Sequence, residues 1–273
     1  MGSLALGERS CVTLLGAGTQ GRRLAGSAEA KTFIWLMGRK ANCMPRQILS
    51  VISSRNLDRW QQEALSLMLQ CVPERIELKR DILQQLDATA PDDTIIASNS
   101  SSYPISELIE GLKLKNDQRI LSAHSYWPPE TPAIEIMGHD NTNPACVDLM
   151  MDRCLQHGFE PFRVKQDSMG YIYNRIWAAI KREALLTASE GVATPEEIDK
   201  IFKSVLKTPK GPFEQMDVVG LDVVLDIEEH YAAKRGNIPE RPRAYLKNLI
   251  DEGRLGVKNG NGFYQYSKSA QGQ

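Results

Sequence analysis

The chain has 273 residues and nearly balanced charge, with 33 lysines and arginines against 34 aspartates and glutamates, which argues against a nucleic-acid-binding protein. Its apolar runs fall short of the ~20 residues of a membrane-spanning helix, and its first residues lack the apolar core of a signal peptide. Five scattered cysteines form no metal-type pair, so we expect a reduced cytoplasmic protein of one large or two medium domains, without metal, nucleic-acid or membrane partners.

The first half of the chain alternates short apolar runs with helical patterns. Helices are expected over residues 73–86 and 105–112. Strands are expected over residues 11–15, 33–37, 94–98, 120–124, 133–137 and 160–164. This alternation predicts an α/β sheet with parallel strands.

The second half is helical almost throughout from Gly170 onward. Thr194, followed by Pro195 and two glutamates, is a strong helix start. Further helices are expected over residues 216–229 and 242–251. We therefore divide the chain into an α/β domain over residues 1–166 and a helical domain over residues 167–273.

A glycine-rich turn follows the first strand. Gly16, Gly18 and Gly21, with Thr19 and Gln20 between them, form the pattern G-x-G-x-x-G. In this setting the first glycine makes the tight turn, the second admits a pyrophosphate and the third allows close helix–strand packing. We favour dinucleotide binding over a glycine turn without a ligand.

The acidic residue that should bind the adenosine ribose about 20 positions later is missing. No aspartate or glutamate occurs between Glu29 and Asp58, and the second strand is followed by Gly38, Arg39 and Lys40. The two basic residues could contact the 2′-phosphate of NADP. We favour the simpler interpretation, solvated charges beside a disturbed second strand.

A histidine and a carboxylate stand close together in the segment SAHSYWPPETPAIEIMG. His124 ends an apolar run, and Glu135 lies within the next one, eleven residues later. Pro128, Pro129 and Pro132 stiffen the link between them. A histidine and a carboxylate held by such a turn could form a hydrogen-bonded pair, the usual form of a general base near neutral pH.

Together these motifs resemble the L-3-hydroxyacyl-CoA dehydrogenase family, including its lambda-crystallin-like members. The similarity is carried by VTLLGAGTQG, CVPERIELKRDIL, DTIIASNSSSYPISEL, AHSYWPPETPAIEIMG, MGYIYNRIWAAIKREAL and LGVKNGNGFYQY, which cover most of the chain outside residues 26–70. The resemblance implies a Rossmann-like N-terminal domain that binds NAD, here shortened, and an all-helical C-terminal domain. It also implies a homodimer and reversible hydride transfer between NAD and carbon 3 of a 3-hydroxyacyl thioester.

The same resemblance assigns residues to the site. His124 matches the histidine that removes the hydroxyl proton, and Glu135 matches its carboxylate partner. Ser101 matches a serine near the substrate hydroxyl and the nicotinamide, and Asn174 an asparagine that contacts the substrate oxygen. The positions that contact the cofactor match Glu74, Lys79 and Lys258.

Some of these residues also have a simpler explanation. Glu74 and Lys79 could be ordinary exposed charges on a helix. Asn174 could cap the long helix that follows it, and Ser101 could belong to a turn that happens to be rich in serine.

Two departures from the family pattern bear on activity. Trp127 stands where the family commonly has an asparagine that contacts the cofactor, and tryptophan cannot reproduce the donors and acceptor of an amide. The segment between the glycine turn and CVPER is also ~40 residues shorter than the family's usual span. The missing part normally supplies the ribose-binding acid and a helical hairpin that helps hold coenzyme A.

The leading hypothesis is an NAD-dependent oxidoreductase for a 3-hydroxyacyl thioester, bound to CoA or to a carrier, or for a related 3-hydroxy acid. The PPETPAIEIMG variant suggests specialised fatty-acid- or polyketide-like metabolism. One alternative is a crystallin-like member whose cofactor site has degraded. Another is an NADP-dependent 3-hydroxy acid reductase, which rests on Arg39 and Lys40 alone.

Overall fold

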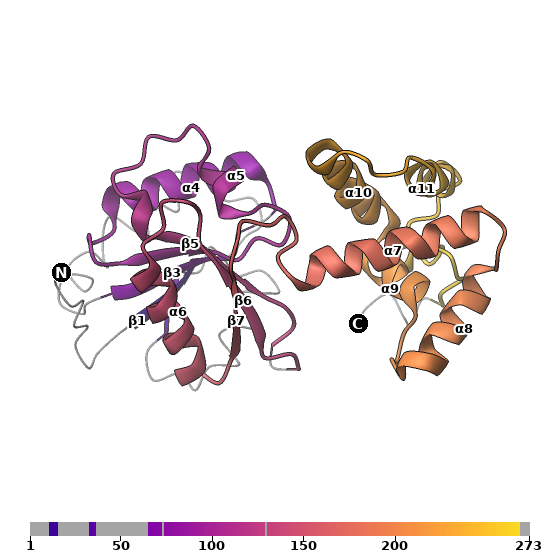
Figure 1. Cartoon of the computed structure of the whole chain (residues 1–273), viewed down its shortest axis with the longest axis horizontal. Coiled ribbons are helices and arrows are strands. Elements are labelled where there is room, and N and C mark those ends of the chain that lie inside the picture. Colours follow the sequence, from indigo (N-terminus) through magenta and orange to yellow (C-terminus); the bar gives the residue numbers. More distant parts are fainter. Residues whose placement is uncertain (1–10, 16–32, 37–64, 73, 129, 268–273) are drawn as a thin grey trace. The chain divides into compact units, whose positions relative to one another are not determined.

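The computed structural model describes residues 11–15, 33–36, 65–72, 74–128 and 130–267. The chain divides into two compact units, Met1–Ile172 and Tyr173–Gln273. The first holds a sheet covered by helices, and the second is built from helices (Figure 1). The domain boundary predicted between residues 166 and 167 lies near this division and stays a prediction.

The described strands form one seven-stranded sheet in the order β2-β1-β3-β4-β5-β6-β7. Neighbouring strands are parallel except for β5 and β6, which are antiparallel. The bounds are Cys11–Leu15 for β1, Phe33–Leu36 for β2, Leu65–Gln70 for β3, Ile95–Ser98 for β4, Ile120–Ser125 for β5, Ala133–Met137 for β6 and Glu160–Val164 for β7.

The prediction of a parallel sheet is wrong at the β5–β6 pair. A parallel neighbour needs a crossover of about a dozen or more residues, and the link over residues 126–132 is too short for one. The strand therefore turns back as a hairpin. The sequence-based prediction also lacked β3 and the helix α6 (Pro144–Gln156).

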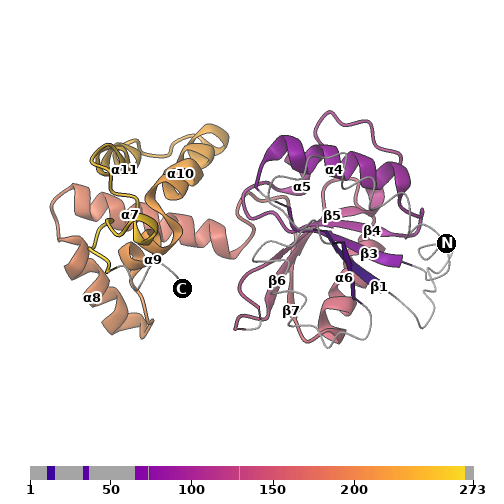
Figure 2. The same cartoon turned by 180° about the vertical axis from the view of Figure 1, so that it is seen from behind.

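Helices cover both faces of the sheet (Figure 2). On one face α4 (Ile76–Thr89) and α5 (Ile105–Ile109) pack with residues such as Ile96 and Ile120. On the other face α6 packs with Leu121 and Ala123. Successive strand residues thus enter opposite cores, as the two-residue period of a strand requires. A 3₁₀ turn, η1 (Asp117–Arg119), leads into β5.

The second unit consists of helices around one core. Its elements are α7 (Tyr173–Ser189), α8 (Pro195–Leu206), α9 (Pro212–Val219), α10 (Leu221–Arg235), α11 (Arg241–Asp251) and the 3₁₀ turn η2 (Val257–Asn259). The predicted helix start at Thr194 is confirmed, since its hydroxyl accepts from the Glu197 amide in a capping box. The helix predicted over residues 216–229 is instead two helices, broken at Gly220, whose φ of 100° suits glycine.

The segment after η2 is bound to α9 through a buried carboxylate. Asp217 accepts hydrogen bonds from the amides of Phe263 and Tyr264, at 2.9 and 3.0 Å, and from the Tyr266 hydroxyl at 2.9 Å. A Cβ atom on Gly262 would lie 2.1 Å from the same carboxylate, so glycine is required there. Within the described part of the chain, no helix is long and apolar enough to cross a membrane.

Candidate active site

The strand order points to a ligand site at one edge of the sheet. From β1 the chain runs outward to β2 and then returns to the other side of β1 with β3. Open α/β sheets bind ligands at the carboxyl ends of the strands at such a reversal. Gly16, Gly18, Thr19, Gln20 and Gly21, as well as Arg39 and Lys40, lie outside the described residues.

Glu74 organises the carboxyl ends of β3 and β4. Its Oε1 atom accepts from the Ser100 hydroxyl at 2.5 Å and from the amides of Ser101 and Ser102, at 2.9 and 3.0 Å. Its Oε2 atom pairs with the Lys79 ammonium at 2.8 Å. The structure therefore brings Glu74, Lys79 and Ser101 together, and their assigned roles toward the cofactor and substrate stay predictions.

Lys79 is not the exposed helix charge considered from the sequence. It is fully buried, and its ammonium also donates to the Val72 carbonyl at 3.1 Å. Burial alone raises the pKa of Glu74, but Lys79 and the serine donors outweigh it and leave that pKa below its usual value. Glu74 thus stays ionised at neutral pH, with 35% of its side chain exposed.

These groups fit a nicotinamide nucleotide. The partly exposed Glu74 carboxylate offers acceptors for a carboxamide or a ribose hydroxyl, and the hydroxyl of the exposed Ser101 can donate or accept. The Ser100 hydroxyl and the amides of Ser101 and Ser102 hold the Glu74 carboxylate in place. Among the described residues at this edge, Glu74 and Ser101 can hold the cofactor. Lys79 is fully buried and supports Glu74 through their ion pair.

His124 and Glu135 face each other across the hairpin. The register of β5 and β6 pairs the two residues directly, so both side chains lie on the same face of the sheet, with Cβ atoms ~5 Å apart. They are 6% and 3% exposed. Burial lowers the pKa of His124 to about 4, while Glu74 raises it and Lys79 lowers it further. The imidazole is therefore neutral at neutral pH.

Two tyrosines that the sequence did not single out surround this pair. Tyr126 donates its hydroxyl to Glu135 Oε2, and its ring lies edge-on to His124 with centroids 4.8 Å apart. The ring of Tyr171 stacks on the His124 ring, with centroids 5.1 Å apart, and the Tyr171 hydroxyl donates to the Ser100 carbonyl at 2.7 Å. The spacing of Tyr126, two residues after His124 on an extended chain, was a usable signal.

Tyr171 thus links the histidine to the serine loop. Its backbone is left-handed, with φ of 54°, which is uncommon for an aromatic residue and is held by the surrounding contacts. The next amide, that of Ile172, donates to Glu135 Oε1 at 2.8 Å. The described site is therefore one connected cluster in the first unit.

The remaining predicted residues are not part of the first unit. Asn174 and Lys258 belong to the second unit. Asn174 lies inside the first turn of α7, so it is not the N-cap residue considered from the sequence. Lys258 forms an ion pair with Asp222. Trp127 is 54% exposed, directly beyond Tyr126.

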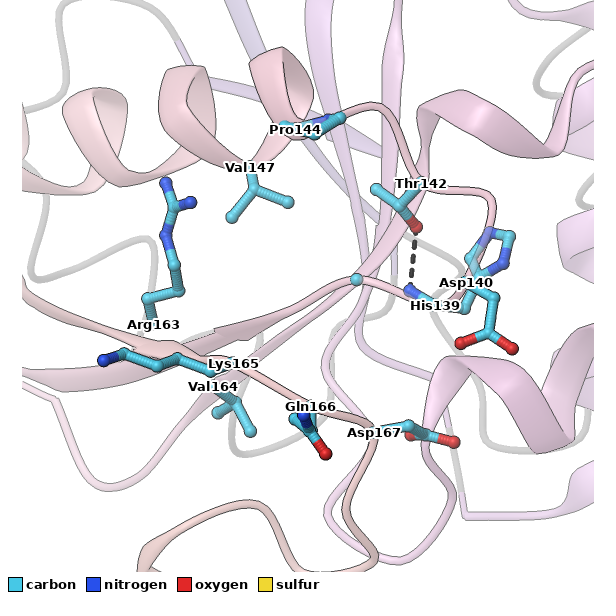
Figure 3. Close-up of a pocket in the computed structure, with 11 residues that line it drawn as sticks. His139, Asp140, Thr142, Pro144, Val147, Arg163, Val164, Lys165, Gln166 and Asp167 are labelled. Atoms are coloured by element: carbon cyan, nitrogen blue, oxygen red, sulfur yellow. Dashed lines mark hydrogen bonds between the residues drawn. The ribbon is translucent and has the colours of Figure 1, made fainter.

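A cavity of about 270 Å³ lies where β6 and β7 end, between these strands and the start of α6 (Figure 3). Because β6 runs antiparallel to β5, the carboxyl end of β6 lies at the opposite end of the strands from His124, which is near the carboxyl end of β5. Val147 and Val164 form part of its wall, and the Thr142 hydroxyl accepts a hydrogen bond from the His139 amide at 2.8 Å. None of the predicted site residues lines it.

The fold is an α/β unit followed by a helical unit, with a candidate nucleotide site where β3 and β4 end. The sequence profile of the 3-hydroxyacyl-CoA dehydrogenase NAD binding domain matches residues 44–168, and that of the C-terminal domain matches residues 170–266. The probable 3-hydroxybutyryl-CoA dehydrogenase of Bacillus subtilis is 30% identical over 227 residues, which are 81% of this chain and 77% of that protein. The chain belongs to the 3-hydroxyacyl-CoA dehydrogenase family, which confirms the resemblance and the NAD-binding domain.

The chain is also similar to two other proteins. The 3-hydroxyacyl-CoA dehydrogenase-like protein LAM1 of Cochliobolus heterostrophus is 40% identical over 156 residues, 56% of this chain. That match covers 33% of LAM1, so the chain spans about a third of it. The structure of (S)-3-hydroxybutyryl-CoA dehydrogenase PaaH1 from Ralstonia eutropha aligns with a TM-score of 0.78 at 25% identity, covering 95% of this chain and 99% of PaaH1.

Proposed function

We propose that the protein interconverts a 3-hydroxyacyl thioester and its 3-oxo form with NAD. The observation that carries this proposal is the position of His124 directly opposite Glu135 in the register of β5 and β6, with both side chains buried on one face of the sheet. His124 is joined through Tyr171 to the Glu74–serine cluster where β3 and β4 end, and Glu135 is bonded to the amide of the next residue, Ile172. A neutral buried imidazole beside a carboxylate, next to groups that suit a nicotinamide, is suited to oxidising an alcohol.

Glu74 and Ser101 would hold NAD, which would supply the acceptor for the hydride from carbon 3. His124 takes the hydroxyl proton as the carbon–oxygen bond becomes a carbonyl, and it can do so because its imidazole is neutral at neutral pH. Glu135 stabilises the imidazolium that results. In the reverse direction the imidazolium returns the proton. We further assign Ser101 to the substrate hydroxyl, Asn174 to the substrate oxygen and Lys258 to the cofactor.

The proposed substrate class is an acyl thioester. In the sequence, residues 26–70 are too short for the family's hairpin that helps hold coenzyme A, which favours a carrier-bound or small thioester in specialised metabolism. Rates with acetoacetyl-CoA and with the same acyl group on a carrier protein test this point. A strong preference for the CoA ester would contradict it.

The protein is also proposed to act as a homodimer in the cytoplasm. The helical unit exposes apolar side chains on α8, at Ile201, Val205 and Leu206, which suit contact with a second copy. Sedimentation velocity tests the dimer, and a monomer at micromolar concentration would exclude it.

The first experiment is a fluorescence titration with NADH and NADPH separately. Binding of NADH supports the proposal, whereas tight binding of NADPH alone supports the reductase alternative. Failure to bind either at millimolar concentration leaves the crystallin-like alternative.

The second experiment compares acetoacetyl-CoA reduction in the wild type and in His124→Gln. General acid–base catalysis contributes about 100-fold or more, so the variant should lose at least that factor. His157→Gln, at the C-cap of α6, is the matched control and should keep the wild-type rate. Equal rates in the wild type and His124→Gln would remove His124 from its assigned role.

A further inference from the structure

The hydroxyl of Tyr126 is hydrogen-bonded to the carboxylate of Glu135. Tyr126 directly follows β5 and stands two residues after His124, so its side chain extends to the same face of the sheet. Across the hairpin it is diagonal to Glu135, within reach of an aromatic side chain. Its hydroxyl donates to Glu135 Oε2, while its ring packs edge-on against His124.

The Glu135 carboxylate is therefore held at both oxygens. Oε1 accepts from the Ile172 amide at 2.8 Å, and Oε2 accepts from Tyr126. Hydrogen bonds to a buried carboxylate are charge-assisted, and each takes up part of its negative charge. That same charge would otherwise favour the protonated form of His124, which lies directly opposite.

We propose that Tyr126 is a positioning residue that holds the Glu135 carboxylate and divides its charge between the tyrosine hydroxyl and His124. The proposal rests on the proposed function, in which His124 handles the substrate proton. A phenylalanine would fill the same space and keep the ring contact with His124. It would leave the carboxylate with one donor fewer and so let it attract a proton to the imidazole more strongly.

Other groups also influence the protonation of His124. Glu74 and Lys79 act on it electrostatically in opposite directions, burial disfavours its charged form, and Tyr171 stacks on its ring. None of these contacts passes through the Tyr126 hydroxyl. Removing that hydroxyl therefore leaves each of these influences on His124 in place.

The test is a histidine titration by NMR. The chain has 4 histidines, so the spectrum of His124→Gln identifies the His124 signal. Tyr126→Phe should raise the pKa of His124 by roughly 0.5 to 1 unit, with unchanged circular dichroism. An unchanged or lower pKa in this variant overturns the proposal.

Two controls separate the proposed effect from general disturbance. Tyr245→Phe, in the helical unit, should leave the His124 signal unmoved. In a Glu135→Gln background, Tyr126→Phe should cause no further shift, because the charge it redistributes is gone. A shift of full size in that background also overturns the proposal.

Kinetics supply a second readout. The pH profile of kcat/KM for hydroxyacyl oxidation should move to higher pH in Tyr126→Phe, in step with the NMR titration. The NMR result does not depend on turnover, so it decides the role of Tyr126 even if the wild type binds no cofactor. In that event only the proposed function fails.

Discussion

His124 should make the stability of the first unit depend on pH. Burial lowers its pKa from 6.5 to about 4 in the folded protein, with smaller opposing effects of Glu74 and Lys79. In the unfolded chain the imidazole titrates near its ordinary value, so unfolding takes up a proton at intermediate pH. The stabilisation is complete above about pH 6.5 and is lost as the pH falls toward 4.

The size of this effect follows from the shift. One pKa unit corresponds to about 1.4 kcal/mol. At about pH 7.5 the imidazole is mostly neutral in both states, whereas at about pH 5 it is mostly charged in the unfolded chain and mostly neutral in the folded protein. The loss of stability between these two pH values is therefore about 2 kcal/mol. That is a large fraction of the stability of an ordinary domain.

The assay is urea denaturation of the wild type and of His124→Gln at both pH values. Other groups also titrate in this range, so the informative quantity is the difference between the two proteins. The wild type should lose about 2 kcal/mol more than the variant. His139→Gln, which removes a half-buried histidine away from the site, should behave like the wild type. An equal loss in the wild type and His124→Gln would refute the reasoning.

Three further predictions concern the helical unit. Glu228→Gln leaves the buried Arg182 guanidinium without its carboxylate and should cost roughly 3 kcal/mol of unfolding free energy; a loss below 1 kcal/mol in urea denaturation would contradict this. Asp217→Asn removes the charge that holds the segment after η2 and should cost roughly 2 kcal/mol. Hydrogen exchange should become faster in the segment after η2 of this variant and stay unchanged elsewhere. Thr194→Ala breaks the capping box of α8 and should lower stability by about 1 kcal/mol, whereas Thr194→Ser should retain most of it.

Much of the sheet could be predicted because its central strands are apolar on both faces. β4 and β5 are buried along their whole length, and each begins with apolar residues, Ile95 to Ala97 in β4 and Ile120 with Leu121 in β5. The direction of β6 does not follow from its own composition, since it depends on the length of the preceding link. The helix α6 had a usable start signal, Asn143 followed by Pro144, with the Asn143 side chain accepting from the Ala145 amide.

The site was predictable only where chemistry depends on side-chain type. His124 and Glu135 could be found as a pair because both residue types and their spacing are informative. The part played by Tyr171 depends on a left-handed backbone, and that of Ile172 on its main-chain amide. Neither feature has a signature in the residue types. The spacing of Tyr126 from His124 places the two side chains on one face of the strand, but the contact of Tyr126 with Glu135 becomes visible only once the register of β5 and β6 is known.

In the hairpin of β5 and β6, the register of the two strands must be kept, whereas the link between them can vary in length. The register is held by residues packed in the core, Ala123, Ile134 and Ile136. One residue inserted into β6 before Glu135 would turn that carboxylate to the other face. Insertions in the link beyond Tyr126 would leave the pair in place. Relatives can therefore diverge in that link without losing the histidine–carboxylate pair, and it is the natural position for grafting new sequence.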